Sequence, residues 1–118
     1  MKKIYYLSTC DTCKRIINDL NLPDDFKLQD IRTEPITEQQ IETMRALSES
    51  YESLFSKRAR LYKELNLKDK SLSDNDYKNY ILEHYTFLKR PVILFNNQIF
   101  IGNSKKTVEA VKQAIHEQ

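Results

Sequence analysis

The sequence predicts one α/β domain whose sheet-forming parts are separated by a helical insertion. Short apolar and aromatic segments with strand character occur only before residue 37 and after residue 88. Between those positions the apolar residues recur at helical spacing, and no segment reads as a strand. We therefore expect residues 1–36 and 89–118 to form one mixed four-stranded sheet with its helices. Residues 37–88 are expected to form the helical insertion.

The first part of the chain has the order strand, helix, strand. Residues 3–8, "KIYYLS", are aromatic, β-branched and apolar, which is typical of a strand. The following apolar residues share one face of a helix and are Cys13, Ile16, Ile17 and Leu20. Residues 26–31, "FKLQDI", form a second strand candidate. Elements of these lengths favour a parallel β-α-β unit.

The insertion contains three helix predictions. Thr37 and Gln40 have the spacing of a capping box before "QIETMRAL". The segment "SLFSKRARLYKEL", residues 53–65, predicts a helix with Leu54, Arg58 and Leu61 on one face. A further helix is predicted from Ser73-Asp74 to Leu88, with His84 on its apolar side.

The last part of the chain predicts a hairpin and a helix. The strand candidates "VILF", 92–95, and "QIFI", 98–101, are joined by Asn96-Asn97, and asparagine tolerates the positive φ of a tight hairpin turn. Ser104 is a candidate cap for a helix with an apolar stripe. With the insertion removed, the order is β-α-β followed by β-β-α. That is the order of a thioredoxin-like fold.

Composition narrows the classes of function. Lys+Arg number 19 against 17 Asp+Glu, a near-balance that argues neither for nor against nucleic-acid binding, and we expect no direct binding of nucleic acid. The apolar part of "MKKIYYL" is too short for a signal peptide or a membrane span. We expect a cytoplasmic protein that does not bind membranes.

Two cysteines, Cys10 and Cys13, form a CxxC motif at the predicted start of the first helix. In a reducing compartment, such a motif near a strand-helix pattern favours a redox-active dithiol. A zinc site needs about four ligands, and only two histidines, His84 and His116, are available without ligand spacing, so no metal is expected. Inert buried cysteines remain the alternative.

The register assigns different roles to the two sulfurs. Cys10 is expected at the first turn, where free N–H groups stabilise a thiolate, so it is the candidate nucleophile. Cys13 shares the apolar face of Ile16 and Ile17 and is the candidate resolving thiol. Arg90-Pro91 precedes a strand, and thioredoxin-like folds carry a cis-proline facing the dithiol there. Pro91 is thus expected to be cis, with Arg90 beside the Cys10 thiolate.

Four segments together resemble the arsenate reductase/Spx family. They are "CDTC", "SKRARLYKELNL" at 56–67, "FLKRPVILF" at 87–95 and "FIG" at 100–102. The resemblance implies a thioredoxin-like fold with a helical insertion, and Cys10 as the redox cysteine. It also implies that Arg58 and Arg90 bind an anion, although Arg58 can equally be a surface arginine. The implied activity is reduction of a small oxyanion or a disulfide, without a tightly bound cofactor and with glutathione, glutaredoxin or thioredoxin as electron donor.

The sequence departs from the arsenate reductases of this family at two positions. It has the second cysteine, Cys13, and it has Gly102 where those enzymes have an arginine. Both features resemble Spx, a redox-sensing regulator that binds the carboxy-terminal domain of the α subunit of RNA polymerase. Two hypotheses follow: a thiol-dependent reductase, and a regulator whose cysteine pair is a sensor. The sequence displays no polymerase-binding surface, so we favour the reductase.

Overall fold

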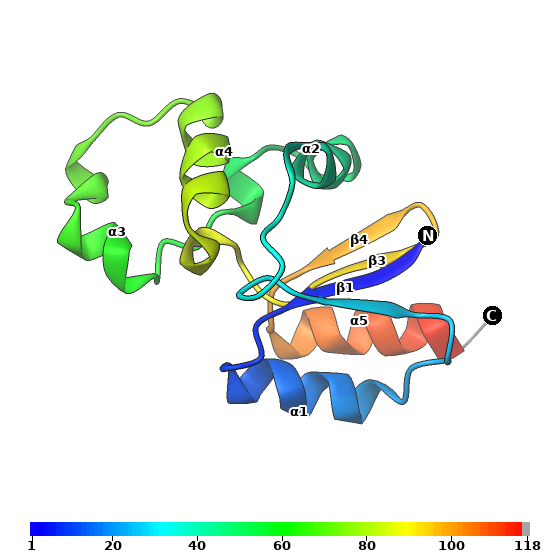
Figure 1. The fold of residues 1–118 in the computed structure, drawn as a ribbon. Coiled ribbons are helices and arrows are strands. Elements are labelled where there is room, and N and C mark those ends of the chain that lie inside the picture. The colour runs from blue at the N-terminus through cyan, green and yellow to red at the C-terminus, as the bar shows by residue number, and fades with distance from the viewer. Residues whose placement is uncertain (117–118) are drawn as a thin grey trace. The chain divides into compact units, whose positions relative to one another are not determined.

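The computed structural model describes residues 1–116 and divides the chain into two compact units (Figure 1). The first unit consists of residues 1–34 together with the C-terminal segment from Arg90 on. The second unit, Pro35–Lys89, lies between these two segments in sequence. No helix in the described part of the chain is long and apolar enough to cross a membrane.

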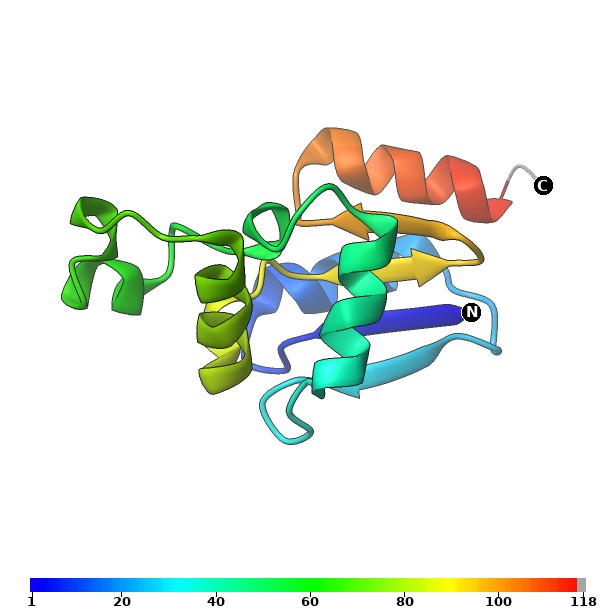
Figure 2. The same ribbon diagram turned by 90° about the horizontal axis from the view of Figure 1, so that it is seen from above.

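The first unit contains the four-stranded mixed sheet that the sequence predicts. Its strands are β1 (Lys2–Tyr6), β2 (Lys27–Asp30), β3 (Val92–Phe95) and β4 (Gln98–Ile101). They lie in the order β2-β1-β3-β4, as Figure 2 shows. The β1–β2 pair is parallel, and the β1–β3 and β3–β4 pairs are antiparallel. This topology confirms the α/β thioredoxin-like fold.

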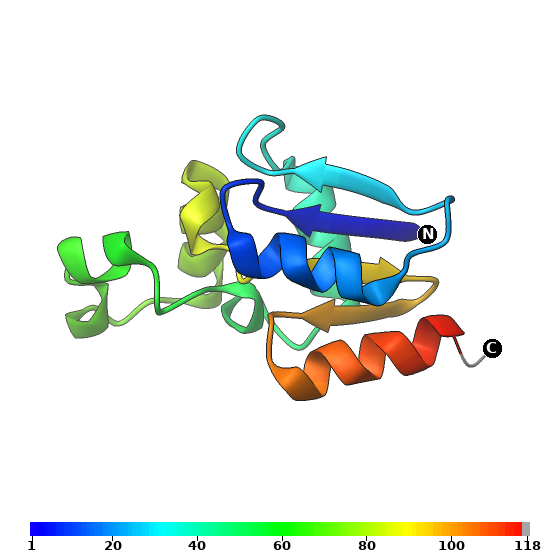
Figure 3. The same ribbon diagram turned by 90° about the horizontal axis from the view of Figure 1, so that it is seen from below.

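Two helices, α1 (Asp11–Leu20) and α5 (Lys105–His116), cover one face of this sheet, as Figure 3 shows. Alternate residues of β1 and β3 point toward them because side chains alternate between the faces of a strand. The buried cluster between sheet and helices consists of Ile4, Ile16, Leu20, Phe26, Ile93, Phe95, Val111 and Ile115. The helical register read around Cys13 is therefore the register that builds this core.

The predicted turn and cap residues of the first unit are confirmed. Asn96 has φ 57° in the two-residue turn that pairs Phe95 with Gln98. Such left-handed backbone is accessible to asparagine at little cost. The Ser104 hydroxyl accepts a hydrogen bond of 3.1 Å from the Thr107 N–H at the start of α5.

The insertion contains α2 (Glu38–Leu47), α3 (Arg60–Glu64) and α4 (Asp74–Glu83), with 3-10 turns at Glu52–Leu54, Leu67–Asp69 and Tyr85–Phe87. The predicted capping box of Thr37 and Gln40 is present. Ser73 caps α4 in a second capping box with Asp76. Each cap satisfies N–H groups that a helix start otherwise leaves without partners.

Two helix predictions in the insertion were wrong. Residues 53–65 do not form one helix, because Phe55 pairs with Leu88 in an antiparallel β-bridge. The Ser56 N–H donates to the Phe87 carbonyl at 2.7 Å, and the Lys89 N–H donates to the Leu54 carbonyl at 2.8 Å. After these bonds the chain turns at Lys57-Arg58, and α3 begins only at Arg60. The second wrong prediction is the helix that was expected to reach Leu88. Because Leu88 takes part in the bridge, α4 ends at Glu83, and the exposed His84 is its C-cap.

The aromatic ring of Phe55 forms the centre of the insertion core. Its centroid is 5.0 Å from that of Phe87 in a stacked pair and 4.8 Å from that of Tyr77 in an edge contact. Both arrangements suit the charge distribution of aromatic rings. The packing gained by Phe55 is the physical reason that this segment leaves the helical pattern.

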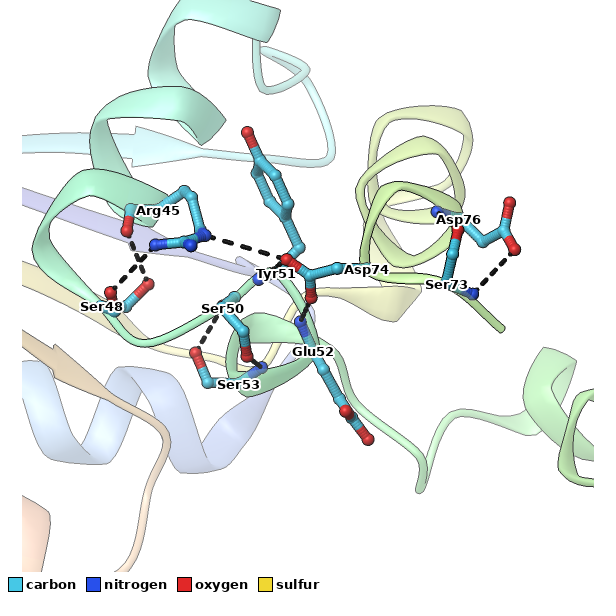
Figure 4. A network of polar contacts seen from close by, with 9 residues as sticks. All are labelled: Arg45, Ser48, Ser50, Tyr51, Glu52, Ser53, Ser73, Asp74 and Asp76. Atoms are coloured by element: carbon cyan, nitrogen blue, oxygen red, sulfur yellow. Dashed lines mark hydrogen bonds and ion pairs between the residues drawn. The ribbon is translucent and has the colours of Figure 1, made fainter. Parts of the chain in front are cut away.

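The Asp74 carboxylate organises the segment between α2 and α4 (Figure 4). It accepts hydrogen bonds of 3.1 Å from the Tyr51 N–H and 3.0 Å from the Glu52 N–H. It also lies 3.8 Å from Nε of Arg45. One side chain at the first turn of α4 thus binds the two backbone N–H groups at the start of the 3-10 turn Glu52–Leu54.

Candidate functional site

Cys10 lies at the point where β1 turns into α1. After Tyr6 the chain makes a tight turn, closed by a 3.0 Å hydrogen bond from the Cys10 N–H to the Leu7 carbonyl. Cys10 is the N-cap of α1, and its carbonyl accepts the Lys14 N–H at 3.2 Å. Its side chain is half-buried. The structure thus places Cys10 at the helix start, as the register predicts.

Cys13 lies one turn further along α1 and is fully buried. It shares its face with the buried Ile16 and Leu20, so it belongs to the same apolar side of the helix. Both cysteines are free thiols in the structure. The pair therefore combines one accessible and one sheltered sulfur within hydrogen-bonding reach of each other.

The pKa of the Cys10 thiol is lowered from its usual value. Partial burial opposes ionisation, but the Cys13 N–H, the Cys13 thiol and the Arg90 guanidinium together outweigh it. The Cys13 N–H is not in regular capping geometry with the sulfur. It still favours the thiolate, because unpaired N–H groups at a helix start carry partial positive charge.

The pKa of the Cys13 thiol is raised to about 11. Burial is the main cause, since a low-dielectric environment disfavours the thiolate. The Leu7 backbone and the Arg90 charge lower this pKa. The Cys10 sulfur raises it further, because the Cys13 S–H donates to the Cys10 thiolate and would lose that bond on ionisation. Of the two thiols, Cys10 is therefore the one that ionises first as the pH rises.

Arg90 and Pro91 lie beside this pair, at the start of β3. The Arg90–Pro91 peptide bond is cis, as the sequence predicts. The Arg90 guanidinium hydrogen-bonds to the Cys10 sulfur and attracts its negative charge. The Pro91 carbonyl accepts a 3.0 Å hydrogen bond from the N–H of Gly102, which has φ 93°. Apart from Gly102 and its two neighbours in the chain, no atom lies within 4 Å of the place where a side chain at Gly102 would begin.

Arg58 belongs to the other unit of the chain. It is exposed and lies in the turn that precedes α3. Its part in an anion site with Arg90 stays a prediction. Cys10, Cys13, Arg90 and Pro91 are therefore the predicted site residues that one compact unit brings together.

Asp30 is a neighbour of this site that the sequence patterns did not predict. Its carboxylate accepts a 3.2 Å hydrogen bond from the Ser8 N–H, in the turn that leads to Cys10. A signal was present, because parallel strands end on the same side of a sheet. The last residue of "FKLQD" is thus expected next to the turn after β1.

The metal-ligating residues of residues 1–116 do not gather into a site. No group of three or more histidine, cysteine, aspartate or glutamate side chains is placed to hold an ion there. His84 instead accepts the Thr86 N–H at 3.1 Å through Nδ1, and His116 Nε2 lies 2.7 Å from the Leu20 carbonyl oxygen. Both histidines thus contact backbone near helix ends.

Comparison with known proteins gives consistent results. The model of the ArsC family matches residues 5–111. The global transcriptional regulator Spx of Lactiplantibacillus plantarum is 26% identical over 107 residues, which cover 89% of this chain and 81% of that protein. The Spx 2 regulator of Bacillus anthracis is 25% identical over 86% of this chain and 79% of its own. The arsenate reductase structure from Vibrio cholerae superposes with a TM-score of 0.78 at 21% identity, covering 93% of this chain and 96% of that one.

Proposed function

Because the chain belongs to the ArsC family, we propose that it is a thiol-dependent reductase in which Cys10 attacks the substrate and Cys13 resolves the intermediate. One observation supports this proposal above the others: of two thiols in mutual contact, one has a lowered pKa and the other a raised pKa. A nucleophile needs the lowered pKa, and a resolving thiol has to stay protonated until the first step is complete.

The first step is attack on a substrate disulfide by the Cys10 thiolate. A bond forms between the Cys10 sulfur and one substrate sulfur, and the substrate S–S bond breaks. The second substrate sulfur leaves as a thiolate and takes a proton from water. Arg90, beside the Cys10 sulfur, carries positive charge at the place where this exchange of negative charge occurs.

The second step is attack by Cys13 on the Cys10 sulfur. Burial still disfavours the Cys13 thiolate, but the repulsion by the Cys10 thiolate is gone once Cys10 is bonded to substrate. The positive charge of Arg90 then favours loss of the Cys13 proton. The substrate sulfur that was bonded to Cys10 leaves and takes up the proton that Cys13 has lost, and a Cys10–Cys13 disulfide forms. The substrate has gained two electrons, which a thiol donor such as glutathione, glutaredoxin or thioredoxin returns to the protein.

A reducible oxyanion is the second substrate class. The Cys10 thiolate bonds the central atom with loss of water, and attack by Cys13 on the Cys10 sulfur releases that atom reduced by two electrons. Arg90 and Arg58 are the candidate anion-binding residues, because guanidinium groups present paired donors to oxyanions. With Gly102 in place of the arginine of arsenate reductases, we rank disulfides above arsenate as substrates.

The test is turnover with a glutathione mixed disulfide and with arsenate, each supplied with glutathione/glutaredoxin and with thioredoxin as donors. We expect disulfide turnover that is lost in Cys10→Ser. Cys13→Ser should accumulate a mixed disulfide on Cys10, visible as an added mass. Full activity of Cys10→Ser, or no turnover with any pair of substrate and donor, contradicts the proposal.

A redox-sensing regulator is the second candidate function. The similarity to proteins named global transcriptional regulators supports it. In that case the same Cys10–Cys13 disulfide is the signal, and the partner is the carboxy-terminal domain of the α subunit of RNA polymerase. Binding of that domain by the oxidised chain, lost on reduction and absent in Cys10→Ser, distinguishes the regulator from the reductase.

A further inference from the structure

We propose that Asp30 is a positioning residue for Cys10, holding the turn between β1 and α1 so that the sulfur stays at the helix start. The inference rests on the proposed function, in which Cys10 is the attacking thiol. It assigns a role in that chemistry to a residue at the end of β2 that acts through the backbone of the turn rather than on either sulfur. Figure 3 shows β1 and β2 ending on the same side of the sheet, where α1 begins.

The strand pairing brings Asp30 to the turn. Tyr6, the last residue of β1, pairs with Asp30, the last residue of β2, and the Ile31 N–H donates to the Tyr6 carbonyl at 2.9 Å. Beyond Tyr6 the parallel ladder stops. The Asp30 carboxylate then continues the contact between the two segments with its side chain.

One carboxylate oxygen of Asp30 binds two backbone donors. Oδ1 accepts the Ser8 N–H at 3.2 Å and the Arg32 N–H at 3.2 Å. The Ser8 hydroxyl donates to the same carboxylate and, as the largest cause, holds the pKa of Asp30 below its usual value. The carboxylate is therefore charged at neutral pH, when these donor bonds are at their strongest.

The held turn leads directly to the nucleophile. Ser8 is bonded to Asp30, and the adjacent Leu7 carbonyl accepts the Cys10 N–H at 3.0 Å. The Leu7 backbone also contacts the Cys13 thiol. A turn that is free to move at Ser8 would move the Leu7 carbonyl, and with it the position of Cys10 relative to the Cys13 N–H and Arg90.

If Asp30 acts only through its negative charge, its removal has the opposite effect on Cys10 from the one expected if it holds the turn in place. As a nearby negative charge alone, Asp30 would disfavour the Cys10 thiolate, so its removal would speed alkylation of Cys10. As a positioning residue, Asp30 favours the thiolate indirectly, so its removal slows alkylation. The two variants Asp30→Asn and Asp30→Ala separate these effects, because asparagine keeps an acceptor oxygen without the charge.

The experiment measures iodoacetamide labelling of Cys10 in the full chain across a range of pH, with each labelled peptide located by mass spectrometry. We expect Asp30→Ala to shift the pH profile upward and to slow Cys10 labelling below the thiol pKa by about threefold to tenfold, since the rate follows the thiolate fraction. Asp30→Asn should recover most of the rate. The matched control is Asp25→Ala, which removes a carboxylate of the same unit that binds Lys2 at 2.6 Å.

An Asp30→Ala profile equal to that of Asp25→Ala overturns the proposal, as does faster labelling in both Asp30 variants. If Asp30→Ala does not fold, Asp30→Asn alone decides: faster labelling of Cys10 in that variant overturns the proposal, and labelling at or below the native rate supports it. Labelling needs no substrate, so loss of the reductase proposal leaves this result interpretable. Conversely, if the Asp30 variants change the labelling rate of Cys10 but the native chain shows no turnover, only the proposed reaction is refuted.

Discussion

Replacement of Arg90 tests the electrostatic basis of the site most directly. Arg90→Gln removes the positive charge and keeps N–H donors, whereas Arg90→Ala removes both. The guanidinium hydrogen-bonds to the Cys10 sulfur and attracts its charge, and both effects lower the thiol pKa. We therefore expect the pKa of Cys10 to rise in both variants, and more in Arg90→Ala.

The expected magnitude follows from the contact. Two opposite unit charges about 4 Å apart attract each other by about 4 kcal/mol at an effective dielectric constant of about 20. Cys10 is only half-buried, so solvent screening leaves part of this energy. An adjacent opposite charge commonly changes an acid dissociation constant by about tenfold or more. At a pH below the thiol pKa, Arg90→Ala should thus label about tenfold more slowly with iodoacetamide.

The assay is the pH profile of Cys10 labelling, resolved from Cys13 by peptide mass. Arg15→Ala is the matched control, because it removes an exposed arginine from α1. Circular dichroism establishes that each variant is folded before rates are compared. A Cys10 profile in Arg90→Ala that matches the native one would refute the idea that Arg90 stabilises the thiolate.

Three further predictions concern stability. Asp74→Ala should lower the free energy of unfolding, measured by urea titration, by about 2 kcal/mol, because two backbone N–H groups lose a charged acceptor. The control is Asp69→Ala at an exposed position, which should change the free energy of unfolding by less than about 0.5 kcal/mol. The pKa of Tyr5 is raised from 10.0 to about 12, mainly by burial and further by the Glu34 carboxylate. The stability that the neutral Tyr5 hydroxyl contributes is therefore complete below pH 10 and is lost as the pH rises toward 12. Tyr5→Phe should therefore lose less stability than the native chain over that range, and parallel alkaline curves would contradict this. Asn96→Ala should cost about 1 kcal/mol, since alanine tolerates φ 57° poorly, and a similar loss in Asn97→Ala would argue against the backbone explanation.

Local signals in the sequence were sufficient for much of the fold. The change of period at Cys13 predicts α1, and the asparagines between two apolar runs predict the hairpin, because both depend on neighbouring residues alone. Capping at Thr37 and Ser104 is equally local, since a helix start needs an acceptor a few residues away. The same register predicts which cysteine is buried, and the cis peptide before β3 agrees with the prediction for Pro91.

The tertiary structure decided the features that depend on residues far apart in the chain. The helical pattern of residues 53–65 is overridden where Phe55 bridges Leu88, because pairing and ring packing outweigh a weak local preference. The ionisation of Cys10 depends on Arg90, and the turn that carries it is bonded to Asp30. Sequence patterns carry no measure of such distances. The chain by itself therefore determined where the dithiol lies in the fold, and only the packed sheet decided which charges and donors surround it.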